Sequence, residues 1–459
     1  MQGKMKDSIR SIYRRLDNKW LRKNIKKIRL SDRPSEKIGA SFLDKKLNLG
    51  QHEKYLNGIS YNAPKKEALE IVAREEWSNF IIDQLCQAQN NLISHRELTS
   101  NVIAKAQVAN SEECNYKYWL EISRSLLYTG FLEAAGKLRD MAIASVLSDK
   151  HKENNVEPLP IFQAALEVGD LDTALEFEKQ VRSKLSSEET LFFRLLIYTL
   201  KGSTEDFEQE LHFLCKQDSS LTSLLNYVQD KSVAIVGPCN TEIDCSQEID
   251  DCDIVIRNRF ISEDDLPFGS GKKTSVAFYT HEHLRILRNS DLSKEILQSL
   301  DFVVLRDHND LPNLVRLGQP KKSISISFPL QSLFFASTPN AIPRIVSNII
   351  LLKPKNVKIF KSNLFLNPTY PRSYLEGKSY INLSTGGGRK HPSKLCKMFA
   401  RFHDPLAQLR FLKKIKDVGL IKGDDEFMSI VELSDPEYMR QLDDVYGQSK
   451  WALSEIFTF

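Results

Sequence analysis

The chain has 459 residues, of which 41% are hydrophobic and 27% charged, values typical of a globular protein. This length exceeds what one ordinary core accommodates and predicts two or three domains. A net charge of only +4 gives no argument from overall charge for binding a polyanion. No apolar run approaches the roughly 20 residues that cross a bilayer, and no apolar signal segment follows the basic N-terminus.

The cysteine content indicates a reduced, cytoplasmic protein. Seven cysteines form no CxxC pair, which does not fit a disulfide scaffold. Cys239, Cys245 and Cys252 lie close in the sequence, but no nearby histidine completes a zinc set.

Residues 1–40 are predicted to form a basic amphipathic arm. The first 30 residues carry eleven Lys or Arg against two Asp. Apolar side chains recur among them at helical spacing: Ile9, Ile12, Tyr13, Leu16 and Trp20. Such a helix either lies on an anionic membrane surface or packs on its own protein with a solvated basic face. No nucleic-acid-binding motif accompanies the charge, so we expect no nucleic-acid partner.

Residues 41–229 are predicted to be helical. Gly130, Gly169 and Gly202 each follow an apolar helix end and precede an amphipathic start, at intervals of 39 and 33 residues. Glycine suits such tight turns because it reaches positive φ without strain. The pattern resembles degenerate tetratricopeptide-type repeats, whose concave face holds a protein or glycan partner. A plain helical bundle is the alternative.

From residue 230 to 459 short strands alternate with helices, which predicts a Rossmann-like parallel α/β domain with its ligand at the carboxyl ends of the strands. The expected strands are "SVAIVG", "DIVIRN", "SVAFYT", "FVVLRD", "KSISIS" and "NVKIFKSNLFL". The expected helices include 291–300 and 340–353, and a further helix is expected over 406–417.

The first two strands end in residues suited to a nucleotide. A strand that stops at Gly237 allows a ligand close to the backbone, and Asn240 and Asn258 offer hydrogen-bond donors and acceptors. The sequence is not GxGxxG, which disfavours a dinucleotide site. The stretch "STGGGRK" lacks the ending of a phosphate loop and is interpreted as a flexible loop. Asp251 and Asp253 have the spacing of a divalent-metal pair, although Asp253 begins a strand.

Three segments in order resemble the motifs of sialyltransferases. "VGPCNTEI" and "EIDDCDIVIRNRF" resemble the first motif, in which a strand ending in Gly precedes an Asn-containing loop. "ASTPNAIPRIVSNIILLKPKNVKIFKSN" resembles the second, with Pro339 where the family has Gly. "FARFHDPLAQLRF" supplies the histidine that follows a lid, here residues 365–402. The resemblance covers roughly residues 231–415 and is closest to bacterial sialyl- and Kdo-transferases, with a variant GT-A glycosyltransferase fold.

The resemblance implies a role for several residues. Gly237, Asn240 and Asn258 would hold a cytidine nucleotide, and Ser337, Thr338 and Asn340 would meet its phosphate at a helix N-terminus. His403 would be the general base, or else an ordinary loop histidine. His391 would assist at the phosphate, or else only belong to the lid. Such enzymes work without a metal or other cofactor.

Other polar residues near the expected site carry weaker expectations. His281 and His283 follow a strand end, where contact with an acceptor or a plain loop is favoured over a metal pair. Arg257 and Arg259 alternate along a strand, so only one of them is expected to reach the site. The lid residues Tyr370, Arg372 and Tyr374 would contact the sugar or nucleotide. The segment "LSDPEYMRQLDDVYG" is predicted to be a packing helix over the sheet.

Together these patterns predict a glycosyltransferase that moves a 2-keto sugar, sialic acid or Kdo, from a CMP-activated donor. The acceptor would be a hydroxyl of a bacterial capsule or lipooligosaccharide at the inner membrane face. The helical region would hold this acceptor or a partner protein. Two alternatives stay open: a repeat-based interaction protein with an inactive α/β domain, and a metal-dependent nucleotide-sugar enzyme using Asp251 and Asp253.

Overall fold

The computed structural model describes most of the chain outside its two ends and the expected lid. The residues described are 76–81, 83–85, 87–88, 92–148, 157–182, 184–288, 290, 292–366, 396, 398–400 and 402–447. The basic arm expected over residues 1–40 and most of the expected lid, with His391, Tyr370, Arg372 and Tyr374, lie outside them.

The chain divides into two compact units. The first comprises residues 1–145, 396–401 and 446–459, and the second comprises residues 146–395 and 402–445. The boundary therefore lies near residue 145, and the helices before residue 229 are shared between the units. Among the described residues no helix combines the length and apolarity needed to cross a bilayer.

The first unit is built from helices that begin and end at strong local signals. Its elements are α6 (His95–Val108), η2 (Ser111–Glu113), α7 (Tyr116–Thr129) and most of α8 (Leu132–Ser148). Ser94 and Glu97 form a capping box at the start of α6, in which each side chain accepts the other's backbone N–H. Trp77 and Trp119 meet edge to face at 5.0 Å in the buried interior.

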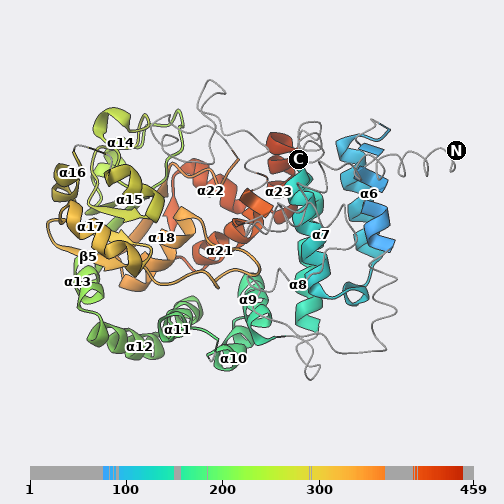
Figure 1. The fold of residues 1–459 in the computed structure, drawn as a ribbon, viewed down its shortest axis with the longest axis horizontal. Helices are drawn as coiled ribbons and strands as arrows, with labels where there is room; N and C mark the ends of the chain where they lie inside the picture. The colour runs from blue at the N-terminus through green and yellow to red at the C-terminus, as the bar shows by residue number, and fades with distance from the viewer. Residues whose placement is uncertain are drawn as a thin grey trace, which may run out of the picture. The chain divides into compact units, whose positions relative to one another are not determined.

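In the second unit five helices precede the sheet. They are α9 (Pro158–Val168), α10 (Leu171–Val181), α11 (Ser187–Lys201), α12 (Thr204–Gln217) and α13 (Ser219–Val228). Each contacts the next, and Figure 1 draws them in green along one side of the sheet-containing part. The predicted glycine turns are confirmed: Gly130, Gly169 and Gly202 end α7, α9 and α11 with φ of 85°, 84° and 70°. That these helices form tetratricopeptide-type repeats stays a prediction.

Among the described residues, seven strands of the second unit belong to one parallel sheet, which confirms the α and α/β class. The strands are β1 (Ser232–Val236), β2 (Ile254–Arg257), β3 (Val276–Tyr279), β4 (Phe302–Leu305), β5 (Ser323–Ile326), β6 (Asn356–Phe360) and β7 (Lys422–Gly423). Their order is β5-β4-β3-β2-β1-β6-β7. The first six are the strands expected from the sequence. Most of them are continuous apolar runs, which are typical of strands buried on both faces.

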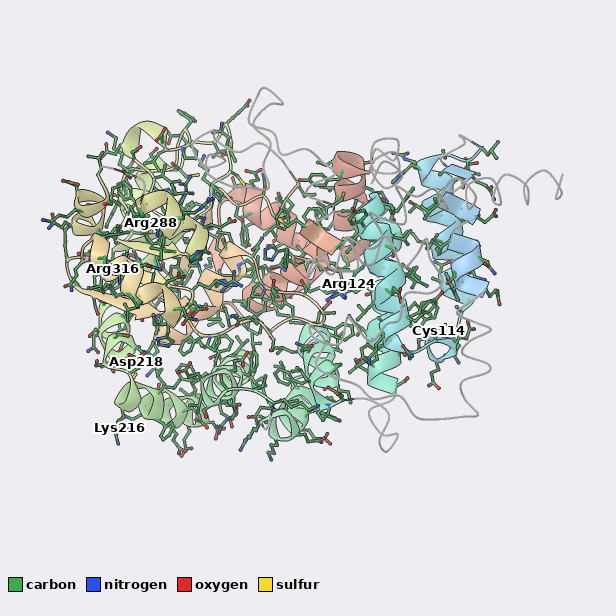
Figure 2. The ribbon with its side chains drawn as sticks, viewed as in Figure 1. Cys114, Arg124, Lys216, Asp218, Arg288 and Arg316 are labelled. Carbon is green, nitrogen blue, oxygen red and sulfur yellow. The ribbon has the colours of Figure 1, made fainter. Side chains whose placement is uncertain are left out.

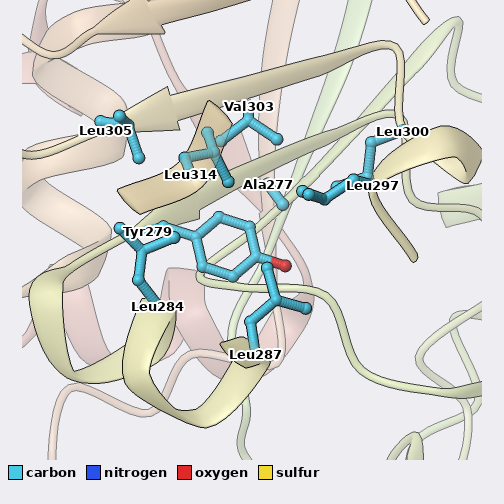
Figure 3. Packing of buried hydrophobic residues seen from close by; sticks show 9 residues of the cluster. All are labelled: Ala277, Tyr279, Leu284, Leu287, Leu297, Leu300, Val303, Leu305 and Leu314. Carbon is cyan, nitrogen blue, oxygen red and sulfur yellow. The ribbon is translucent and has the colours of Figure 1, made fainter. Parts of the chain in front are cut away.

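Further helices connect the strands, and the last two follow β7. They are α14 (Ser246–Asp250), α15 (His281–Arg288), α16 (Ser293–Ser299), α17 (Leu311–Leu317), α18 (Ala341–Ile349), α21 (Pro405–Asp417), α22 (Asp425–Glu432) and α23 (Asp435–Tyr446), with the short turns η4 (Glu263–Asp265), η5 (His308–Asp310) and η6 (Ile350–Leu352). Leucines of α15, α16 and α17 pack on Ala277, Tyr279, Val303 and Leu305 of β3 and β4 (Figure 3). α18 contacts β1.

The strand order reverses between β1 and β6. From β1 the chain builds outward to β5 and then returns to pair β6 with the other side of β1. At this point the strand ends touch: the Gly237 N–H donates to the Phe360 carbonyl at 2.8 Å. A Cβ on Gly237 would stand 2.3 Å from the Lys361 carbonyl oxygen. Glycine is therefore required here by the neighbouring backbone, whatever ligand approaches.

We expect Gly237→Ala to lower the free energy of unfolding by about 3 kcal/mol, because the backbone of Lys361 cannot yield as a side chain can. Urea denaturation measures this change. Gly202→Ala is the control: nothing lies within 4 Å of its Cβ position, so only its φ of +70° costs energy, about 1 kcal/mol. An equal loss in both variants would contradict the steric account.

Lys414 ties α9 to the α/β part of the second unit. Lys414 of α21 donates from Nζ to the carbonyls of Leu166, at 2.9 Å, and Glu167, where α9 ends. The side chain as a whole is half-buried, with its ammonium turned inward onto these carbonyls. Burial lowers its pKa to about 8, opposed by the nearby Glu167 carboxylate.

This lysine makes stability depend on pH in the alkaline range. Because its pKa is lower in the folded protein than the ordinary 10.5, the unfolded chain binds more protons between about pH 8 and 10.5. The free energy of unfolding should therefore rise through that window relative to Lys414→Met, as followed by urea denaturation at each pH. Lys216→Met, at an exposed site on α12 (Figure 2), should leave the pH profile of the wild type unchanged.

Candidate functional site

The sequence-predicted residues gather at one edge of the sheet. Gly237 and Asn240 follow β1, and Asn258 follows β2. Ser337 and Thr338 precede α18, which returns from the carboxyl edge toward the start of β6. In a parallel sheet all of these positions lie at the carboxyl edge, and the reversal between β1 and β6 is where ligands bind in open α/β sheets.

The Ser-Thr segment and the histidine segment are in direct contact. The Thr338 N–H donates to the Phe402 carbonyl at 2.7 Å. The Ser337 and Thr338 hydroxyls donate to the same oxygen, at 3.1 and 2.9 Å, and the Asp404 N–H donates to Ser337 Oγ at 2.9 Å. Both hydroxyl hydrogens are thus used within the protein, so in this arrangement neither hydroxyl can also donate to a phosphate.

His403 is held in one tautomer. Its Nδ1 lies 2.9 Å from the Thr338 carbonyl oxygen, which can only accept, so Nδ1 carries the proton. In the neutral ring Nε2 is then the atom with the lone pair. Asp404, which follows directly, does not orient the imidazole: its carboxylate caps α21 by accepting the N–H groups of Leu406 and Ala407. The helix expected over 406–417 is confirmed as α21, which runs from Pro405 to Asp417.

A fully buried glutamine joins the two segments. Gln408 donates from Nε2 to the carbonyls of Thr338 and Asp404, at 3.1 and 3.2 Å. Its Oε1 accepts the Asn340 N–H at 2.9 Å. The Gln408 side chain of α21 therefore fixes the N-terminus of α18. The position of Thr338 depends on this N-terminus, and the position of His403 depends on Thr338.

Replacing this glutamine should loosen the site. Gln408→Leu keeps the volume but leaves buried backbone groups unpaired, so we expect a loss of about 2–3 kcal/mol in the free energy of unfolding. Amide hydrogen exchange should rise at Thr338 and Asn340. Gln229→Leu, at an exposed site, should change neither quantity. Unchanged exchange in Gln408→Leu would show that the N-terminus of α18 does not depend on this side chain.

The loops after β1 and β6 are linked by Lys361. Its side chain is buried, and Nζ donates to Thr241 Oγ1 at 2.6 Å and to the Ile243 carbonyl. Its backbone N–H donates to the buried carboxylate of Asp424 at 2.7 Å. These bonds shape the loop that presents Asn240, which is exposed. Asn258 is half-buried on the neighbouring strand end.

Arg257 has a structural role. Its guanidinium is buried and donates to the carbonyls of Ser270, Gly271 and Lys273 and to Thr274 Oγ1. Burial lowers its pKa to about 10, with Asp250 opposing the shift. Arg259 is also buried and has a φ of 88°. Of the two arginines, Arg257 is committed to holding the loop over residues 270–274.

A histidine and a carboxylate meet at the ends of β3 and β4. His281 Nδ1 lies 2.8 Å from Asp310 Oδ1; the imidazole is 78% exposed and the carboxylate 5%. A carboxylate on Nδ1 orients the imidazole and leaves Nε2 toward solvent. His283, in contrast, is buried, so the two histidines do not act as a pair. Among the described residues no cluster has the ligands for a metal ion.

Asp253 lies at the opposite, amino edge of the sheet. Its carboxylate accepts the N–H and hydroxyl of Ser232 at 2.8 and 2.7 Å, which lowers its pKa. A surface hollow of about 590 Å³ also opens at this edge, between Lys231 and Lys322. The Tyr227 phenol that lines it donates to Asp301 at 2.6 Å, and this bond with burial raises its pKa. Neither feature reaches the carboxyl edge.

Several residues of the site carry no signal in the sequence analysis. Gln408, Lys361 and Asp310 act through partners far along the chain, so spacing does not reveal them. Asp310 follows a strand end, and this position was the one available hint. Arg344, which is buried in α18, was likewise not identified from the sequence.

No protein-family model matches the chain, and no curated protein is significantly similar to it.

Proposed function

We propose that the protein is a glycosyltransferase that moves a 2-keto sugar, sialic acid or Kdo, from a CMP-activated donor to a hydroxyl of a bacterial surface polysaccharide. The observation that carries this proposal is the direct contact between the Ser-Thr segment and the histidine segment. They are 65 residues apart in the sequence and meet at the N-terminus of α18, on the carboxyl edge beside the β1–β6 reversal.

The reaction needs a base, and His403 has the required form. With its proton fixed on Nδ1, Nε2 can accept the proton of the acceptor hydroxyl. As the acceptor oxygen bonds to the anomeric carbon, the bond from that carbon to the phosphate oxygen breaks, and cytidine monophosphate leaves with the electron pair. The products are the glycosylated acceptor and cytidine monophosphate, and the imidazole is left protonated.

The nucleotide would lie across the ends of β1 and β2. Asn240 and Asn258 follow these neighbouring strands and offer amide donors and acceptors to base or ribose. The positive end of α18 favours the phosphate, so the proposal uses no metal. We place the enzyme in the cytoplasm at the inner membrane face, with the arm over residues 1–40 on anionic lipid and the helices α9 to α13 holding the acceptor or a partner protein.

His281 is a second candidate for the base, because the Asp310 carboxylate contacts its imidazole. The buried carboxylate of Asp310 holds His281 by Nδ1, so the Nε2 atom of this imidazole is also turned away from its partner. His281 follows β3, two strands from β1, so it would serve an acceptor that extends toward β4. The variants below separate the two histidines.

Nucleotide binding tests the donor class. Calorimetry without metal should show binding of cytidine monophosphate but not of uridine or guanosine diphosphate, and Asn258→Ala should abolish it. In a transfer assay with CMP-sialic acid and CMP-Kdo, His403→Gln should lower kcat by roughly 10²–10⁴-fold while nucleotide affinity stays the same. His281→Gln should keep kcat. If no nucleotide binds, the chain is better explained as an interaction protein with an inactive α/β domain.

A further inference from the structure

Arg344 is a buried cation near the N-terminus of α18. Its side chain is 7% exposed. Nη2 reaches the Pro339 carbonyl at 3.4 Å, so the guanidinium points back toward the start of its own helix. Among the described residues no carboxylate pairs with it. Of its five N–H donors, the part of the chain that the structure describes provides an acceptor for one, and that bond is long.

The surroundings of Arg344 are positive. Burial lowers the pKa of Arg344 to about 9, and the charge of Arg306, exposed after the end of β4, adds to this shift. The positive end of the α18 dipole adds to this potential. A desolvated cation beside a second cation is unfavourable in the empty protein. An anion bound to the Arg344 guanidinium would remove that cost.

The N-terminus of α18 lacks a cap in the same place. Asn340 occupies the capping position but makes no capping hydrogen bond, and its Oδ1 is buried without a partner. The hydroxyls of Ser337 and Thr338 donate to the Phe402 carbonyl instead. The first N–H groups of the helix therefore face a position where no side chain of the described residues satisfies them, as in anion sites at helix N-termini.

We infer that Arg344, Arg306 and the uncapped N-terminus of α18 form a phosphate-binding site. Resting on the proposed function, the phosphate is that of cytidine monophosphate, and the two guanidinium groups take the charge that develops as it leaves. Arginine suits this role because its planar donors match the oxygens of a phosphate. The hydroxyls of Ser337 and Thr338 then serve to hold the His403 segment.

Stability of the empty protein gives the first test. Arg344→Met keeps much of the volume and removes the unpaired charge, so its melting temperature without ligand should equal or exceed that of the wild type. A structural arginine would lower it instead, which would overturn the inference. Arg306→Gln changes an exposed residue and stays usable whatever Arg344→Met does.

Binding gives the second test, by calorimetry with cytidine monophosphate and with cytidine. The wild type should bind the nucleotide more tightly than the nucleoside. Arg344→Met and Arg306→Gln should each weaken nucleotide binding, for Arg344→Met by on the order of tenfold to a hundredfold, and leave nucleoside binding unchanged. Arg316→Gln, an exposed arginine of α17 labelled in Figure 2, is the matched loss of charge and should behave as wild type.

The outcomes separate this inference from the proposed function. If the wild type prefers the nucleotide and both variants keep that preference, the phosphate site is wrong and the donor class stands. If no nucleotide binds, inorganic phosphate is compared with chloride at equal ionic strength. A phosphate-dependent rise in melting temperature that Arg344→Met loses would then keep the site and reject the cytidine donor. Absence of both effects would reject both.

Discussion

The close contact between β1 and β6 is the constraint on which the second unit depends. The two strands pair in register from Ser232 with Asn356 to Val236 with Phe360, and Gly237 then passes against the Lys361 carbonyl. No side chain fits between these strand ends. The contact fixes where the strand order reverses, and the loop after β1 stays bonded to the end of β6, since the Cys239 N–H donates to the Lys361 carbonyl at 3.1 Å. Lys361, which follows β6, holds the loop after β1 through its Nζ. The conformations of the two loops therefore depend on each other.

Arg257, Lys414 and Arg344 show how this unit accommodates positive charge that is turned inward. Arg257 meets a row of backbone carbonyls, and Lys414 meets the carbonyls at the end of α9, where the helix dipole is negative. Arg344 has one long bond to Pro339 and lies at a positive helix end beside Arg306. The first two charges are compensated by the folded chain. The charge of Arg344 is compensated only if a bound ligand supplies an anion, which is why we infer an anion site there.

Patterns that repeat along the chain predicted the fold well, because they act locally. Apolar runs gave the strands, and Gly130, Gly169 and Gly202 gave helix ends. The parallel topology then brought the Ser-Thr and histidine segments to one edge. The detailed bonding was beyond prediction: Gln408 reaches Thr338 across 70 residues, and His281 meets Asp310 across 29. The use of the Ser337 and Thr338 hydroxyls on Phe402 likewise depends on backbone positions that no sequence pattern specifies.

The late pairing of β6 has a consequence for synthesis. When residues up to the end of β5 have left the ribosome, β1 to β5 can pair, but β1 is still an edge strand with an open row of N–H and C=O groups. It becomes an interior strand only after residue 360 emerges. Edge strands that stay open invite pairing with other chains, so the nascent protein passes through a stage prone to aggregation. A chaperone that shields β1 until β6 arrives would raise the yield of folded protein more than one acting after release.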